Sequence, residues 1–532
     1  MTHFENMNGR KVLTVDGKPS FLLAGEIHNS NSSCIEAMRG SWDSADALGI
    51  TTLLIPVTWE MIEPEEDKFD FDLVKELVLE ARNRNGHLGI LWFGAWKNSQ
   101  CMYAPEWVKK DRARFKRAQM KKEMDRITLD SFYGLPYSTL SYLCEETKRA
   151  DAKAFCRFME WLKDFDEKEQ TVLYIQVENE TGVMGAPREL SDEADALFNG
   201  PAPQGLIEYL RANTAEMEAE LKKDIEENDG KEGPLTWTEA FGNSAEEIFS
   251  VYYTAGYCEY VASQGKKIYD LPMAVNAWLR QGPPGSYPTG GPIWQMMEVW
   301  QYAAPSIEVF CPDIYVRNFL EVCDNYVKRG NPLFIPETAC NGRVGARLVY
   351  SIGHYHAACF APFGFEDMGN AEKNPAMAIF GADPSDPLLN ESQDIAEYRQ
   401  YSDILASMND LLVAAYGTKN LQAVTSERPE EAEMDFGEIR FTAMSQLPMI
   451  EKKDGVCLVL KESSECYYIL INRAMLNYAS GDETKPNAEL LSLDEGRFED
   501  GRWVTTLHRN GDEAQSLMFM KPTLLRCRLF TY

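Results

Sequence analysis

The chain has 532 residues, of which 44% are hydrophobic and 11% aromatic, a composition typical of a globular protein and not of a disordered one. This length is large for a single domain, so we expect two domains. The formal net charge of −30 gives an acidic surface that repels nucleic acid and anionic membranes, and we expect neither as a partner.

Several further classes are disfavoured by missing patterns. The start of the chain, MTHFENMNGRKVLTVDG, lacks a basic stretch followed by an apolar run, so we expect no signal peptide. No segment approaches the ~18 apolar residues of a membrane-spanning helix. The twelve cysteines form no CxxC pair, which predicts reduced thiols in a cytoplasmic protein. The six histidines form no HExxH motif, and we expect no metal and no cofactor.

One segment runs against the acidic balance of the chain. Residues 109–126, KKDRARFKRAQMKKEMDR, contain nine basic and three acidic side chains. We interpret this segment as an exposed helix or loop that faces acidic neighbours.

Apolar runs alternate with helix-like segments from residue 20 to about 410. The runs are FLLAGEIH (21–28), TTLLIPVTW (51–59), LGILWFGAW (88–96), VLYIQVENE (172–180), PMAVNAW (272–278), IEVFCPDIY (307–315), PLFIPET (332–338) and AACFAPFGF (357–365). Such near-continuous runs are typical of parallel strands buried on both faces. Eight strands with intervening helices predict a (β/α)8 TIM barrel over residues 1–412. The long connections 97–171 and 181–271 are expected to cover its active-site end.

The pattern changes beyond residue 412, where short strands are separated by turn-rich loops. In LLRCRLFTY, Leu525, Cys527 and Leu529 alternate with Arg526 and Arg528, so that one face is apolar and the other charged. Residues 413–532 therefore predict an antiparallel β-sandwich. We expect this accessory domain to be structural or to form a homo-oligomer contact, with glycan binding as the alternative.

Polar side chains stand at the carboxyl end of every predicted strand. They are Glu26, His28 and Asn29; Trp59 and Glu60; Trp96 and Asn98; Glu178, Asn179 and Glu180; Asn276 and Trp278; Asp313 and Tyr315; Glu337; and Glu366. In a (β/α)8 barrel these ends converge where catalysis takes place. Acids combined with tryptophans suit glycoside hydrolysis, in which one acid protonates the leaving oxygen and a second carboxylate attacks or activates water.

The fourth strand ends in two acids separated by an amide. Side chains alternate along a strand, so Glu178 and Glu180 are expected to point the same way and Asn179 the other, until the strand ends. Glu180 lies nearer the end and is the better candidate catalyst. Glu178, one layer deeper, is expected to form hydrogen bonds within the barrel.

Four segments carry a resemblance to a known family. IQVENETG resembles the acid/base segment of family 35 glycoside hydrolases, the β-galactosidases of clan A. VTWEMIEPEEDKFDF resembles the second-strand segment of families 35 and 42, with Asp67 where glycine is usual. GEIHNSN and LWFGAWKNSQCMYAPEWVKKDRARF are similar to a bacterial branch with a C-terminal β-domain, although the tyrosine that commonly follows the first-strand histidine is missing. The resemblance covers roughly residues 15–410 and, more weakly, the tail.

This resemblance implies roles for four residues. Glu180 would be the acid/base and Asn179 would bind the sugar 2-hydroxyl, while Glu337 in LFIPETAC would be the nucleophile and Tyr315 in CPDIY its hydrogen-bond donor. Enzymes of this clan retain anomeric configuration, so the two carboxyl groups should lie about 5–5.5 Å apart. The strand count from apolar runs places these glutamates on strands four and seven independently.

Further substrate contacts are predicted at other strand ends. The candidates are Glu26, His28 (which could also be a core histidine), Asn29, Trp96, Asn98, Asn276 and Trp278. Trp59 is expected to pack in the barrel, and Glu239 and Glu298 to be structural.

The sequence leads to a retaining exo-β-galactosidase, and three alternatives stay open. A β-xyloside, α-L-arabinoside or β-glucoside would be cleaved by the same two glutamates. A non-catalytic glycan-binding barrel would be expected to lose one of these carboxylates, and this chain keeps both. A metal-dependent carboxylate barrel would need acids on adjacent strand ends with a lysine or histidine base, and Lys97 is the only lysine near the predicted site.

Overall fold

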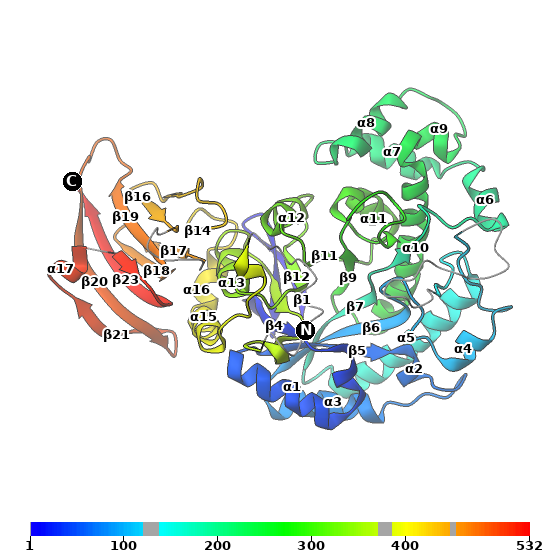
Figure 1. Cartoon of the computed structure of the whole chain (residues 1–532), viewed down its shortest axis with the longest axis horizontal. Helices are drawn as coiled ribbons and strands as arrows, with labels where there is room; N and C mark the ends of the chain where they lie inside the picture. The colour runs from blue at the N-terminus through cyan, green and yellow to red at the C-terminus, as the bar shows by residue number, and fades with distance from the viewer. Residues whose placement is uncertain (1, 121–137, 371–385, 447–453, 516) are drawn as a thin grey trace.

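The computed structural model describes residues 2–120, 138–370, 386–446, 454–515 and 517–532. At its centre, eight parallel strands close into a barrel in the spatial order β11-β12-β13-β4-β5-β6-β7-β9 (Figure 1). Their bounds are β4 (Leu22–Glu26), β5 (Thr52–Thr58), β6 (His87–Lys97), β7 (Val172–Asn179), β9 (Met273–Trp278), β11 (Val309–Ile314), β12 (Phe334–Thr338) and β13 (Cys359–Pro362). Each overlaps one of the predicted apolar runs, and the predicted barrel is confirmed.

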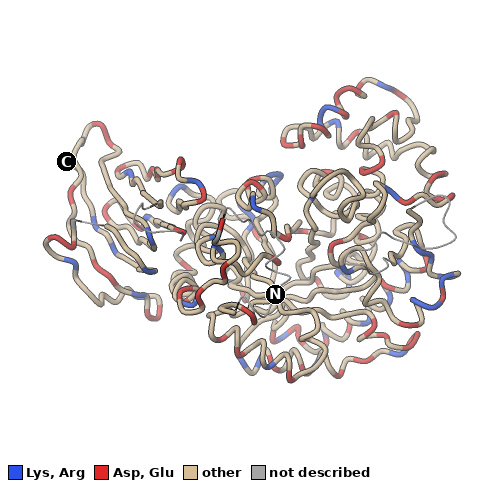
Figure 2. The backbone as a smooth tube through the Cα atoms, in the orientation of Figure 1, with Lys and Arg blue, Asp and Glu red and all other residues tan. Residues whose placement is uncertain are grey.

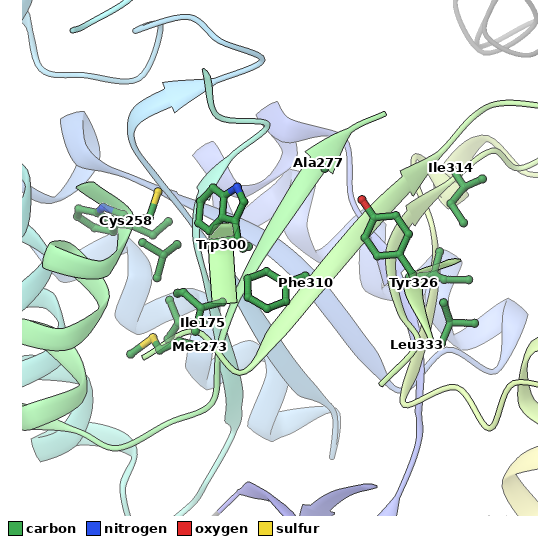
Figure 3. Packing of buried hydrophobic residues seen from close by; sticks show 14 of the residues in the cluster. Ile175, Cys258, Met273, Ala277, Trp300, Phe310, Ile314, Tyr326 and Leu333 are labelled. Atoms are coloured by element: carbon green, nitrogen blue, oxygen red, sulfur yellow. The ribbon is translucent and has the colours of Figure 1, made fainter. Parts of the chain in front are cut away.

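Helices cover the outside of the barrel, each with an apolar stripe against the strands. In α3, Val74, Leu77 and Val78 are buried, whereas the charged residues between them face solvent. Figure 3 shows this packing on another side, where Trp300 of α11 meets Phe310 of β11 edge to face with ring centroids 6.2 Å apart. The helices that follow barrel strands are α1 (Ile35–Leu48), α3 (Asp72–Asn83), α5 (Glu145–Asp166), α10 (Ala245–Ile268), α11 (Met297–Ala303), α12 (Phe319–Tyr326), α13 (Val344–Gly353) and α15 (Ile395–Ser407).

A small N-terminal sheet, which the sequence did not predict, packs on the barrel. It consists of β1 (His3–Met7), β2 (Arg10–Val15) and β3 (Lys18–Ser20), paired antiparallel in that order. Leu13 of β2 belongs to the same apolar cluster as Leu22, Leu91 and Phe334 from the barrel strands. This sheet therefore extends the barrel core beyond the strands themselves.

Shorter elements fill the connections between barrel strands. In the connection 181–271, α7, α8 and α9 stand together at one end of the barrel (Figure 1, upper right). The bounds are α2 (Trp59–Ile62), α4 (Glu106–Lys110), β8 (Gly182–Val183), α6 (Asp192–Phe198), α7 (Gln204–Ala212), α8 (Ala219–Glu227), α9 (Trp237–Phe241), β10 (Thr289–Gly290) and α16 (Asn409–Ala414), with short 3₁₀ turns at 29–33, 242–244, 294–296, 365–367 and 387–389.

The C-terminal part forms two antiparallel sheets that share one core, so the predicted β-sandwich is confirmed. The larger sheet contains β14 (Leu421–Thr425), β17 (Val456–Ser463), β18 (Cys466–Asn472), β23 (Thr523–Thr531), β20 (Ala488–Glu499) and β21 (Arg502–Arg509), in that spatial order. The smaller sheet contains β15 (Glu433–Asp435), β16 (Ile439–Met444), β19 (Ala474–Ser480) and β22 (Leu517–Phe519), and a short helix α17 (Asp512–Gln515) precedes β22. Leu525, Cys527 and Leu529 face the shared core as their alternation predicts.

The outer face of the larger sheet packs against the barrel. Leu458 of β17 and Ala423 of β14 contact the end of α13 so closely that a Cβ on Gly353 would lie 2.7 Å from Ala423 Cβ. Arg347 of α13 donates to both carboxylate oxygens of Glu427 at 2.9 and 2.7 Å. The two parts of the chain are thus joined by apolar packing and by a buried bidentate ion pair. Residue 412 lies inside α16, and the first strand of the sandwich begins at Leu421.

Charged residues of both signs are spread along the backbone of the barrel and of the sandwich (Figure 2). In the described part of the basic segment, Lys109 pairs with Glu60, Arg114 with Glu66 and Lys116 with Glu193, so this part faces acidic neighbours. Residues 121–126 of that segment lie outside the described residues. Within the described ranges, the helices are all too short or too polar to cross a membrane. All twelve cysteines are free thiols.

Candidate active site

Five ionisable side chains from five strands come together at the carboxyl end of the barrel. They are Glu26 at the end of β4, Lys97 at the end of β6, Glu180 just after β7, Asp313 in β11 and Glu337 in β12. Each is at most 6% exposed. Each of the other four residues appears among the charges that shift the pKa of Asp313, so the five groups lie within mutual electrostatic reach. We call this set the five-residue cluster.

Glu337 is held by a direct hydrogen bond. The hydroxyl of Tyr315, the residue after β11, donates to Oε1 of Glu337 at 2.5 Å. Burial and the neighbouring Glu337 carboxyl raise the pKa of Tyr315 well above its ordinary value, so the phenol stays a neutral donor. Oε2 of Glu337 is buried and has no hydrogen-bond partner in the described protein.

Glu180 lies in a different environment within the same cluster. Burial, followed by the charge of Glu337, raises the pKa of Glu180 to about 7, against the opposing effect of Lys97. Its backbone N–H donates to Oδ1 of Asn276 at 3.0 Å, and Asn276 in turn donates from Nδ2 to Asp313 at 2.6 Å. The amide of Asn276 therefore links the backbone of the acid/base candidate to a second buried acid.

Glu178 does not share the direction of Glu180, and the prediction from strand alternation is wrong. Oε2 of Glu178 accepts a hydrogen bond from Trp96 N at 2.8 Å, and its carboxyl group bonds Asp151 of α5 outside the barrel. The cause is the backbone, because Glu178 and Glu180 have φ angles of 63° and 45° and so leave the extended conformation. Burial, then Asp151, raises the pKa of Glu178, and the pair holds a proton behind the strand.

Glu26, within the cluster, and Asn179, beside it, present polar atoms without protein partners. Among the described residues, neither carboxylate oxygen of Glu26 and neither polar atom of the Asn179 amide has a hydrogen-bond partner, although all four atoms are buried. Buried polar groups in folded proteins are nearly always bonded. These side chains therefore have unused hydrogen-bonding capacity at the barrel end.

Trp96 is not available as a sugar platform, contrary to the prediction. It is 1% exposed, its ring lies 4.5 Å from Tyr257 of α10, and its indole N–H donates to the carbonyl of Leu140. The side chain faces the helices outside the barrel because it alternates with the inward-facing positions of β6. Trp59 is fully buried and donates to Glu63, as a packing residue would.

The other predicted residues lie near the barrel end and differ in their contacts and burial. Nε2 of His28 lies 2.8 Å from Asp367, Asn29 begins the 3₁₀ turn after β4, Asn98 follows β6 with a φ of 52°, and Trp278 ends β9 half-buried. Glu366 accepts hydrogen bonds from Asn31, Ser41 and the His28 backbone. Glu239 forms a helix-capping box with Thr236. Glu298 forms an ion pair with Arg329. The last three acids thus have structural partners, as predicted for Glu239 and Glu298.

Sequence reasoning did not include Lys97 and Asp313 among the site residues. Both stand at strand ends, which was the available signal, but a strand end does not reveal which side chains converge. Asp313 is two positions before Tyr315 and pairs in register with Glu337 of the neighbouring strand.

Comparisons with known proteins add little to this geometry. A family described as "Domain of unknown function (DUF5597)" matches residues 398–521, which cover most of α15, all of α16 and most of the sandwich. A comparison with curated protein sequences finds no match.

Solved structures with a similar arrangement include glycoside-cleaving enzymes. The β-galactosidase from Bacillus circulans sp. alkalophilus is 14% identical with a TM-score of 0.46, over 74% of this chain and 57% of that chain. The β-galactosidase from Halorubrum lacusprofundi is 13% identical with a TM-score of 0.44, over 74% and 61%. The catalytic domain of a Paenibacillus polymyxa β-amylase is 11% identical with a TM-score of 0.43, over 72% and 97%. This chain thus spans about three fifths of both β-galactosidases, and at these values the likeness assigns it no activity.

Proposed function

We propose that this protein is a retaining glycoside hydrolase that removes a terminal β-linked sugar, with Glu337 as nucleophile and Glu180 as acid/base. The observation that carries the proposal is the unequal environment of two glutamates in one cluster. Tyr315 donates to Glu337, which stabilises its ionised form, whereas burial and Glu337 raise the pKa of Glu180 to about 7. A retaining mechanism requires one carboxylate and one carboxylic acid at neutral pH.

The reaction proceeds in two displacements. Glu337 attacks the anomeric carbon while Glu180 protonates the departing oxygen, which gives a covalent glycosyl-enzyme and the free aglycone. Glu180, now ionised, removes a proton from water as the water attacks the anomeric carbon, and Glu337 leaves. Asn276, through its bond to the Glu180 backbone, positions the acid/base for both steps.

The sugar is held by the polar atoms that the protein leaves without partners. The amide of Asn179 offers a donor and an acceptor to the 2-hydroxyl, and Glu26 offers two acceptor oxygens to other hydroxyls. Galactose is the sugar that the segment IQVENETG favours through its resemblance to family 35, and xylosides, arabinosides and glucosides are the alternatives to test.

A panel of aryl glycosides tests the proposal. Wild type should release phenol from at least one glycoside, and Glu337→Gln should lower turnover by about a thousandfold or more. The matched control is Glu60→Gln, which removes an acid that follows β5 but pairs with Lys109 outside the cluster, and it should keep full turnover. Hydrolysis of no glycoside by wild type would end the proposal.

The roles of the two glutamates are separable by leaving group. Glu180→Ala should lose more activity on aglycones that need protonation than on dinitrophenyl glycosides, because a good leaving group departs without an acid. Azide should restore turnover to Glu337→Ala and give a product of inverted configuration. Equal losses of Glu180→Ala on good and poor leaving groups would contradict the acid role.

A second candidate, carbon–carbon bond chemistry at a carboxylate barrel, is favoured by the position of Lys97 among four acids. A Schiff-base lysine must lose its proton, however, and although burial lowers the pKa of Lys97, the four carboxyl groups outweigh burial and raise it above its ordinary value. No group of three or more metal-ligating side chains occurs in the part of the chain that the structure describes. Aldol cleavage without glycoside hydrolysis would favour this candidate, and its loss on adding chelator would indicate the metal-dependent form.

A further inference from the structure

Lys97 differs from the other buried cations of this protein. Among the described residues, Lys97, Arg188 and Arg347 are buried, and the side chain of Arg329, which pairs with Glu298, is 5% exposed. Arg188 pairs with Asp195 and Glu246, and Arg347 pairs with Glu427. Lys97 has no hydrogen bond or ion pair from its ammonium to any described residue, and its Nζ lies over the Phe93 ring, 5.2 Å from the ring centroid. A buried cation without a partner is costly, so its position calls for a reason.

The backbone fixes Lys97 at the barrel end. It is the last residue of β6, its N–H donates to the carbonyl of Gln100 at 2.8 Å, and it pairs with Asn179 across the ladder to β7. The ammonium is thus carried by a strand end and not by a mobile loop. This placement puts it beside the amide that the proposed mechanism assigns to the 2-hydroxyl.

Lys97 stays protonated although no carboxylate forms an ion pair with it. Glu337, Glu180, Glu26 and Asp313 all stabilise the ammonium form and together outweigh burial. The side chain therefore carries three N–H donors and no acceptor. Glu26, on the other side of β5, carries two acceptor oxygens that no described residue uses.

A donor set and an acceptor set of this kind match a sugar hydroxyl, which both donates and accepts. We propose that Lys97 binds a hydroxyl of the terminal sugar, with Glu26 as the accepting partner, and that this pair selects the sugar that the enzyme cleaves. This inference rests on the proposed function. It adds a substrate contact that the reacting glutamates do not provide, and it makes Lys97 a specificity-determining residue.

The competing explanation is that Lys97 only offsets the charge of the four acids. In that case, replacing it would alter the pH dependence and turnover equally for every substrate. A direct contact would instead produce a loss that depends on one hydroxyl, because removing that hydroxyl and removing the ammonium delete the same hydrogen bond.

The test is a double-mutant cycle between the protein and the substrate. Wild type and Lys97→Met are assayed for kcat/KM on the best aryl glycoside and on its monodeoxy forms at each non-reacting ring position. For one position, we expect deoxygenation to lower kcat/KM of wild type by about tenfold or more and to have little further effect on Lys97→Met. Lys75→Met, on the exposed face of α3, is the matched control and should behave as wild type.

Two variants keep the test independent of folding. Lys97→Gln retains a polar side chain, and its melting temperature together with that of Lys97→Met reports whether the cluster tolerates the loss of charge. The wild-type losses on deoxy sugars do not depend on any variant. Independent effects of deoxygenation and substitution at every ring position would overturn the inference while leaving the hydrolase intact, whereas failure of wild type on all glycosides would overturn the proposed function itself.

Discussion

Replacing Glu180 with glutamine should stabilise the protein at alkaline pH while it disables the acid/base. The pKa of Glu180 rises from an ordinary 4.5 to about 7 because of burial and then Glu337. A carboxyl group with a raised pKa opposes folding once it must ionise in the folded state. Each pH unit between the two pKa values corresponds to about 1.4 kcal/mol, so the penalty reaches about 3 kcal/mol.

The sign of this effect fixes the pH window. Below pH 4.5 the carboxyl is protonated in folded and unfolded chains alike, and it imposes no penalty. As the pH rises toward about 7, the unfolded chain releases the proton first and the folded state loses stability. Above about 7 the penalty is complete. Glutamine mimics the protonated form at every pH, so the free energy of unfolding of Glu180→Gln should gain on wild type by about 3 kcal/mol across this window.

Urea unfolding followed by tryptophan fluorescence measures this difference. All of the eleven tryptophans except Trp503 lie before residue 413, so the signal reports mainly on the barrel. The control is Glu76→Gln on the exposed face of α3, which removes a carboxyl group far from the cluster. The difference between Glu180→Gln and wild type should widen between about pH 4.5 and about pH 8, and that of the control should stay constant. A pH-independent difference for Glu180→Gln would refute the raised pKa and the acid role built on it.

Three further changes have outcomes fixed by local contacts. Tyr315→Phe removes the donor to the nucleophile and should lower kcat by about 10- to 100-fold with an unchanged melting temperature; full turnover would contradict this. Gly94→Ala places a Cβ 2.6 Å from carboxyl oxygens of Asp151 and Glu178 and should lower the free energy of unfolding by about 1–3 kcal/mol. The control Gly40→Ala, whose Cβ would have no atom within 4 Å, should not lower it. Arg347→Met leaves Glu427 buried without its partner and should cost about 3–5 kcal/mol in urea unfolding, and adding Glu427→Leu should recover most of it. A double variant as unstable as the single one would contradict that reasoning.

The barrel strands were predictable because their side chains are buried on both faces of each strand. Strands such as β5 and β7 are buried at every position, so their sequences are continuous apolar runs that few other elements produce. The N-terminal sheet gives no such signal. Its strands are half-exposed and short, and β2 buries only a few side chains, so the pattern there does not differ from that of a loop.

Alternation along the strand accounts for the direction of Trp96 but not for that of Glu178. Glu178 and Trp96 both point to the helices, the first because a left-handed φ breaks the strand and the second because it continues the outward register of β6. Non-glycine residues seldom adopt that backbone, and the surrounding hydrogen bonds to Asp151 and Trp96 hold it in place. This backbone strain depends on contacts made in the folded protein, so the segment VENE by itself does not indicate it.

The identity of the nucleophile and the acid depends on partners from other strands, and this is why a pair of glutamates alone does not define the chemistry. Four carboxyl groups this close cannot all be ionised, and Lys97 offsets the charge of only one. The carboxylate that receives a neutral phenol donor is the one whose charge is best stabilised, and that is Glu337. Glu180 accepts no phenol hydrogen bond in the described protein, and burial together with the charge of Glu337 outweighs its hydrogen bond with Asp313 and the charge of Lys97, so it keeps its proton to about pH 7. The division of roles between two identical side chains thus follows from Tyr315.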